Sequence, residues 1–321
     1  MKRLAAAALA ASAMTAVSVA LAAPAASADL VTYCVGEGGA VTVPGDLFVP
    51  PGESCSLDGT TVTGNVRVAA DSNLVVTGGK FNRDVQVAAN GYFDATNTTV
   101  DGQVVLAPGG FGIFLRGATT GKLTIQPKGS ATRDGFVFLD HATVNGDVLS
   151  SVGEVRFEAG SQIIGNVTTT GTFYTDVRDS FVDGTLSVTN NAEGSVVCGS
   201  AVQGSSTFTG NQGGVQLGPN GALAGCTSGG YFGRDVSVGN TTGPVRVDDN
   251  IINGKLMFSA NNPIATVAPN NRIRGGITGE HQAPAAATAL AAPSRPTVTD
   301  QRAQDRRAQA LQAAAAPEPA H

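Results

Sequence analysis

The chain has few of the residues that most often carry chemistry or bind polyanions. Only 14% of its 321 residues are charged, the formal net charge is −5, and there are 3 histidines and no tryptophan. A weakly acidic chain with so few basic residues lacks the positive surface that nucleic-acid binding requires, so we expect no nucleic-acid partner. Aromatic residues make up 5% of the sequence and the 4 tyrosines are scattered, so no stacking platform for sugars is evident.

Long apolar runs are absent beyond the first 28 residues, so we expect no membrane span there. The run inside those residues has another character: residues 2–3 are basic, residues 4–21 are apolar and rich in alanine, and Ala26-Ser27-Ala28 is a small-residue cleavage site. This pattern predicts a signal peptide over residues 1–28. The mature protein is therefore expected to be secreted, either extracellular or associated with the cell surface.

What the sequence has in abundance is a glycine-marked repeat of about 20 residues. The glycine occurs in ten of twelve units, and Arg83 and Arg234 replace it in the other two. The position two residues further on is apolar in every unit except one, and it falls at Leu47, Val66, Val85, Val104, Leu123, Val148, Val167, Leu186, Ser206, Val236, Leu256 and Ile277. The residue four places earlier is also almost always apolar, and in a strand both side chains point to one side. A unit of this length cannot bury its apolar side alone and must stack on its neighbours.

The repeat predicts an all-β fold, a single-stranded parallel β-helix (β-solenoid) of about 12 rungs, each of about 19–21 residues. Parallel strands joined by crossovers of one sense favour right-handed winding. We place this domain at residues 29–279. Residues 280–321 are rich in alanine and proline and are expected to form a disordered tail. A transient helix near its end would present mostly alanine and bury little.

The four cysteines fall into two pairs that are close in sequence. In an exported chain this arrangement favours disulfides, and the absence of close C-x₂-C spacing and of paired histidines argues against a metal site. Of the three possible connectivities, we favour Cys34–Cys55, which spans about one rung, and Cys198–Cys226, which lies in the longest step of the repeat. No cofactor is expected.

The outward positions of the repeat contain the only candidates for catalysis. They include Asp84, Asp101, Lys122 and Asp147. Asp84 and Asp101 could approach one another on adjacent rungs, and two carboxylates at the right separation are the minimum for glycoside hydrolysis. Lys122 could pair with Asp147. The alternative is that these residues are the polar surface of any half-exposed strand, which contains several aspartates by default.

Two units, residues 61–68 (TVTGNVRV) and residues 142–148 (ATVNGDV), resemble the short-rung β-helices of bactofilins and of repeat-built bacterial adhesins. The resemblance covers about residues 41–279 and implies the fold rather than an activity. Bactofilins are cytoplasmic polymers, whereas the signal peptide and cysteines here indicate export. We therefore expect a secreted, non-enzymatic structural or surface-interaction protein of the cell envelope or extracellular matrix. Its partners would be extracellular polysaccharide or further copies of itself. The alternative is a polysaccharide lyase or glycoside hydrolase of the β-helix type.

Overall fold

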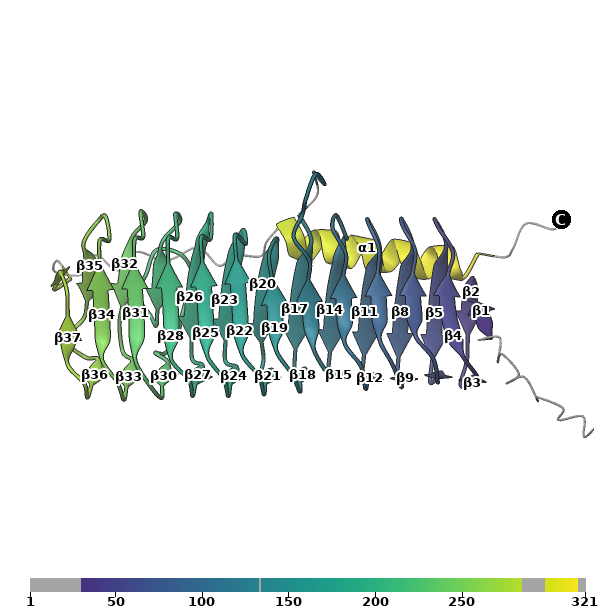
Figure 1. The fold of residues 1–321 in the computed structure, drawn as a ribbon, viewed down its shortest axis with the longest axis horizontal. Helices are drawn as coiled ribbons and strands as arrows, with labels where there is room; N and C mark the ends of the chain where they lie inside the picture. Colours follow the sequence, from purple (N-terminus) through teal and green to yellow (C-terminus); the bar gives the residue numbers. More distant parts are fainter. Residues whose placement is uncertain (1–29, 133, 285–297, 317–321) are drawn as a thin grey trace, which may run out of the picture.

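The chain winds into a long rod of stacked turns, each contributing one short strand to each of three parallel sheets (Figure 1). The computed structural model describes residues 30–132, 134–284 and 298–316. The predicted signal peptide lies outside these residues. Sheets A and B each contain 13 strands and sheet C contains 12, and every pairing is between strands one turn apart. The prediction of an all-β parallel β-solenoid of about 12 rungs is confirmed.

The strands are short and their bounds repeat from turn to turn. Sheet A consists of β1 (Val31–Tyr33), β4 (Asp46–Val49), β7 (Val66–Val68), β10 (Val85–Val87), β13 (Val104–Leu106), β16 (Leu123–Ile125), β19 (Val148–Ser150), β22 (Val167–Thr170), β25 (Leu186–Thr189), β28 (Ser206–Thr209), β31 (Val236–Gly239), β34 (Leu256–Ser259) and β37 (Ile277–Thr278). Sheet B consists of β2 (Gly36–Gly38), β5 (Ser54–Asp58), β8 (Asn73–Thr77), β11 (Tyr92–Thr96), β14 (Gly112–Arg116), β17 (Phe136–Asp140), β20 (Glu154–Glu158), β23 (Tyr174–Arg178), β26 (Gly194–Cys198), β29 (Val215–Leu217), β32 (Val245–Val247), β35 (Ala265–Val267) and β38 (His281–Gln282). Sheet C consists of β3 (Thr42–Val43), β6 (Thr61–Val62), β9 (Lys80–Phe81), β12 (Thr99–Val100), β15 (Thr119–Thr120), β18 (Thr143–Val144), β21 (Gln162–Ile163), β24 (Phe181–Val182), β27 (Ala201–Val202), β30 (Tyr231–Phe232), β33 (Ile251–Ile252) and β36 (Arg272–Ile273).

The core is a set of columns of like side chains that run along the rod axis. Val85 pairs in register with Val66 on one side and with Val104 on the other, and all three are fully buried. Because each residue packs on its equivalent one turn away, the apolar positions of the repeat form one continuous core from end to end. Burial of a single valine or leucine of this kind contributes about 1.5–3 kcal/mol relative to exposure.

The repeating glycine is required by the spacing of the backbone at one corner of the rung. A Cβ atom built on Gly184 would lie 2.4 Å from the carbonyl oxygen and 2.7 Å from the carbonyl carbon of Gly165 in the preceding turn. The φ angle of Gly184 is not in the left-handed region, so close approach explains the glycine better than conformational freedom does.

Gly184→Ala is accordingly expected to lower the free energy of unfolding by about 2 kcal/mol, because the added methyl forces two backbones apart. Urea unfolding followed by far-UV circular dichroism measures the change. Gly39→Ala is the matched control, since its Cβ would meet no atom within 4 Å. Equal stability of the two variants would contradict the close-approach explanation.

Both predicted disulfides are present. Cys34–Cys55 joins the first turn to the second, and Cys198–Cys226 joins β26 to the long segment that precedes β30. The Cα atoms are 5.6 Å apart in each bridge. The chain contains no other cysteine, so none is left free.

The C-terminal segment differs from the expected disordered tail. The solenoid continues to β38, and residues 298–314 form a 17-residue helix, α1 (Val298–Ala314). Figure 1 shows α1 lying lengthwise along the rod, and it contacts β2, β5 and β8 of sheet B. The helix is ordered because it buries Ala303, Ala310 and Ala314 and forms ion pairs with the sheet. Within the described residues, no helix has the length and apolar character that crossing a bilayer requires.

Candidate functional site

The predicted catalytic residues Asp84 and Asp147 are engaged in stacking one turn of the rod on the next. Asp84 Oδ1 accepts a hydrogen bond from the backbone N–H of Gln103 at 3.0 Å, and Asp147 Oδ1 accepts one from the backbone N–H of Asn166 at 2.8 Å. The same contact recurs at other turns, where Asp46 accepts from Asn65 and Asp235 accepts from Lys255. These carboxylates form a ladder of side-chain to backbone bonds along one corner.

Asp101, on the turn that follows Asp84, makes a contact of a different kind. Asp101 lies 3.7 Å from the Nζ atom of Lys80, and the two side chains are 48% and 57% exposed. An ion pair this exposed contributes little to stability. No ion pair between Lys122 and Asp147 is formed in the described part of the chain. Nor does that part bring three or more histidine, cysteine, aspartate or glutamate side chains together as a metal site would.

Asp84→Ala is expected to lower the free energy of unfolding by about 1 kcal/mol, because the N–H of Gln103 loses its acceptor. Asp84→Asn is expected to cost less, since Asn166, one of the equivalent residues in the next turns, uses its amide oxygen to accept from the backbone N–H of Thr185 at 2.9 Å. Urea unfolding of both variants checks this order. If alanine were tolerated as well as asparagine, the ladder would not stabilise the rod.

A denser group of charges, missed in the sequence, lies on the outer face of sheet B. Arg156 on β20 donates to Glu154 at 2.9 Å and, across the interface, to Asp300 of α1 at 2.6 Å. On the next strand Arg178 Nε donates to both carboxylate oxygens of Asp176, at 2.7 and 2.8 Å. Arg156 and Asp176 are paired in register, so charges of opposite sign alternate along and across the strands.

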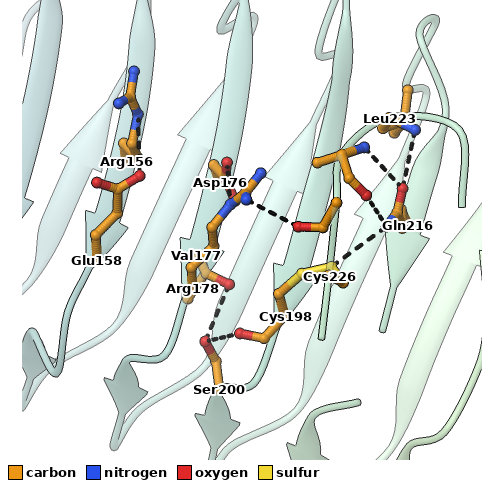
Figure 2. Close-up of polar contacts among 12 residues, drawn as sticks. Arg156, Glu158, Asp176, Val177, Arg178, Cys198, Ser200, Gln216, Leu223 and Cys226 are labelled. Carbon is orange, nitrogen blue, oxygen red and sulfur yellow. Dashed lines mark hydrogen bonds and ion pairs between the residues drawn. A yellow bond between two sulfur atoms is a disulfide. The ribbon is translucent and has the colours of Figure 1, made fainter. Parts of the chain in front are cut away.

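Glu158 completes this charged group, which we define as Glu154, Arg156, Glu158, Asp176 and Arg178. Figure 2 shows Arg156 and Glu158 on one strand and Asp176 and Arg178 on its neighbour. Burial raises the pKa of Glu158 above its usual value, Arg156 opposes that rise, and the nearby Asp176 adds to it. Burial likewise raises the pKa of Asp176, against the lowering effect of Arg178. These carboxyl groups hold protons more tightly than carboxyl groups in water do.

The raised pKa of Glu158 makes the free energy of unfolding depend on pH. Between the unfolded pKa, near 4.5, and the higher folded value, the native state keeps a proton that the unfolded chain has released. The free energy of unfolding therefore falls as pH rises through that window. Glu158→Gln is expected to flatten this slope, measured by urea unfolding from acid to neutral pH. Because Asp176 interacts with Glu158, the comparison reports the change in the coupled pair. An unchanged slope would show that Glu158 is not the group responsible.

On one side of the charged group lies the loop between β29 and β30, which hydrogen bonds and a disulfide hold in place. Gln216 donates to the carbonyl of Ala224 at 2.8 Å and accepts from the backbone N–H groups of Leu223 and Ala224 at 3.0 and 3.1 Å. The Cys198–Cys226 bridge ties the same loop to β26 (Figure 2). Arg178 also donates to the carbonyl of Gly225 in this loop at 3.1 Å.

On its other side the charged group continues into an aromatic strip, which we define as Tyr92, Phe111, Phe136 and Phe138. Neighbouring rings in it lie with centroids 4.6–6.2 Å apart. All four residues are at most 6% exposed. Although these side chains project from the outer side of the rod, they form a small second core with Ala303 of α1.

Beside these rings Asp94 is fully buried as a carboxylate that pairs with two arginines. Arg116 lies 2.6 Å away on the neighbouring strand and Arg307 reaches it from α1, while the hydroxyl of Tyr92 donates to its second oxygen at 2.5 Å. A carboxylate without exposure requires such partners. The sequence signal for this site was the alternation of aromatic and charged residues on the outward side of the sheet B strands, as in Tyr92 and Asp94 of β11.

The surface that the structure assembles is thus a row of aromatic and charged side chains on sheet B, covered by α1 and by the disulfide-tethered loop. This surface holds helix α1, and burial raises the pKa of two of its carboxyl groups, Glu158 and Asp176. No protein-family model matches this chain, and searches of curated proteins and of solved structures found no similar protein.

Proposed function

We propose that the chain is a secreted, non-enzymatic β-solenoid that acts as a structural or surface-interaction protein of the cell envelope or extracellular matrix. The observation that carries the proposal is the use of the outward aspartates. Asp84 and Asp147 bind the backbone of the next turn, so the polar column that could have held catalytic groups serves to stack the rungs. The two disulfides are consistent with an extracellular location.

The ends of the rod support the interaction part of the proposal. At the first turn Leu30, Val31, Tyr33, Val35 and Val41 are 42–68% exposed. Strands β1, β2 and β3 are the first of their sheets, and among the described residues each leaves one edge without a partner strand. An exposed strand edge with apolar side chains favours pairing with another chain. Further copies of the protein, or a polysaccharide of the extracellular matrix, are the partners we propose.

The deciding experiment incubates the oxidised mature protein with acidic and cell-wall polysaccharides, and it measures both binding and the release of soluble fragments. We expect binding without release. Fragment release that disappears in the Asp84→Asn and Asp101→Asn variants would overturn the proposal. Sedimentation of the same sample tests self-association, and a strict monomer at high concentration would remove the end-to-end assembly of rods.

One observation favours the alternative, a polysaccharide lyase or glycoside hydrolase. Glu158 has a raised pKa and lies near a second carboxylate, Asp176, on the adjacent strand. Glycoside hydrolysis uses two neighbouring carboxyl groups, one of which has a raised pKa and acts as the acid. If fragments were released, their loss in Glu158→Gln would assign the activity to this pair rather than to Asp84 and Asp101.

A further inference from the structure

Helix α1 is attached to the rod by a small number of side-chain contacts. Arg306 Nε donates to Asn73 Oδ1 at 2.6 Å, its Nη2 donates to the carbonyl of Asn90 at 2.9 Å, and its guanidinium lies 4.9 Å from the ring centre of Phe111. At the other end of the helix Asp300 pairs with Arg156 at 2.6 Å. The helix adds no strand to any sheet.

The apolar surface that α1 itself contributes to its contact with the rod is small. The buried residues that α1 itself contributes are Ala303, Ala310 and Ala314, and alanine has the smallest apolar side chain. Because α1 lies outside the hydrogen-bonded sheets, we expect it to open before the strands of the rod do. The rod beneath is continuous without α1, so the helix can leave while the solenoid stays intact.

Opening of α1 would expose the aromatic strip. Tyr92, Phe111, Phe136 and Phe138 would then form one contiguous apolar patch, with Asp94 and Arg156 as charges beside it. Exposed patches of this kind are binding surfaces. Their charges match α1, because Asp94 faces Arg307 and Arg156 faces Asp300. The aromatic strip therefore complements α1, either of its own chain or of another copy.

The connection to α1 permits either arrangement. Residues 283–297 join β38 to the helix, and 15 residues span at most about 50 Å when extended. The helix begins beside β20, which is six strands from β38 in sheet B. That separation is about 29 Å at the usual strand spacing. The remaining length allows α1 to reach the strip of a second rod lying alongside.

We propose that the aromatic strip is a docking surface for α1 of a second copy, so that neighbouring rods exchange their C-terminal helices. In dilute solution the helix docks on its own rod, because the connection gives it an effective concentration in the millimolar range. In a crowded array of rods the exchanged form competes, since each contact made within one chain is remade between two. The inference goes beyond the proposed function and is independent of whether the rod has an activity.

A charge exchange at one contact tests the proposal with full-length chains. Asn73→Lys places a cation opposite Arg306, and Arg306→Glu places a carboxylate over the carbonyl of Asn90 and the face of Phe111. In each single variant, the helix no longer complements the strip of the same chain. In a 1:1 mixture, the unchanged helix of the first variant fits the unchanged strip of the second. The carboxylate introduced on the helix of the second variant then pairs with the ammonium group introduced on the strip of the first.

We expect each single variant alone to lose amide-exchange protection over residues 298–314 by at least tenfold. The mixture is expected to recover it together with a species of twice the chain mass in sedimentation. The double variant Asn73→Lys/Arg306→Glu, which is matched within one chain, is the control for folding and for the pairing and should be a protected monomer. If the double variant were protected but the mixture of single variants stayed monomeric and unprotected, the exchange of helices would be overturned. Single variants that remained as protected as the unchanged protein would show that this contact does not hold the helix, and would overturn the proposal as well.

Discussion

Phe157→Ala is expected to lower the free energy of unfolding by about 4 kcal/mol. Phe157 lies in β20 near the middle of the rod, is fully buried, and is paired in register with Leu139 on one side and Val177 on the other. The cavity that alanine would leave cannot collapse easily, because the hydrogen bonds of the strands above and below fix the spacing of the turns. Urea unfolding monitored by circular dichroism measures the loss.

Phe181→Ala is the matched control for this prediction. Phe181 is on the outside of sheet C and is 51% exposed, so its removal is expected to change stability by no more than about 0.5 kcal/mol. A loss of similar size in the two variants would mean that the column of inward residues is not what stabilises the rod.

Removing the Cys198–Cys226 bridge, by Cys198→Ser together with Cys226→Ser, is expected to cost about 3 kcal/mol. The bridge closes a loop with a sequence separation of 28, and it holds Leu223 and Ala224 against Tyr174 and Val196 on the outer face of sheet B. The unfolded chain gains freedom when this loop opens. The loss is measured by urea unfolding of the oxidised protein and of the double variant.

A variant that keeps the Cys198–Cys226 bridge provides a control for this loss of stability. Gln216 braces the same loop through Leu223 and Ala224, so Gln216→Ala in the oxidised protein tests the loop contacts while the bridge remains. If the double serine variant were no less stable than Gln216→Ala, the stabilisation would come from the hydrogen bonds rather than from the covalent link.

The architecture could be predicted from the sequence because the core repeats. Val66, Val85 and Val104 occupy one position of consecutive units, and a residue that packs on its own equivalent leaves its signal at a fixed spacing. The two disulfides followed from the same spacing. The repeating glycine was visible in the sequence, but its cause, contact between the backbones of successive turns, depends on distances that the sequence does not contain.

The candidate site was harder to predict, since its contacts join residues far apart in the chain. Arg307 meets Asp94 across a sequence separation of 213, and Asp300 meets Arg156 across 144. Neither pair belongs to the repeat. The polar, alanine-rich sequence of α1 has almost no apolar face to indicate docking, and its order depends on partners on the sheet. Asp84 and Asp147 were predicted at outward positions of the repeat, whereas their bonds to the next turn depend on the register of the rungs.

The stacking of the turns also determines how the rod would respond to a pull along its length. Hydrogen bonds between neighbouring strands run along the axis, so tension applied at the ends loads them directly, one turn at a time. At the N-terminal end the first two turns are joined by the Cys34–Cys55 disulfide. The last strands, β36 to β38, have no disulfide to the turn before them, because all four cysteines lie elsewhere in the chain. A stretched rod should therefore unravel turn by turn from its C-terminal end, and a sequence of similar force steps, rather than one large rupture, is its mechanical signature.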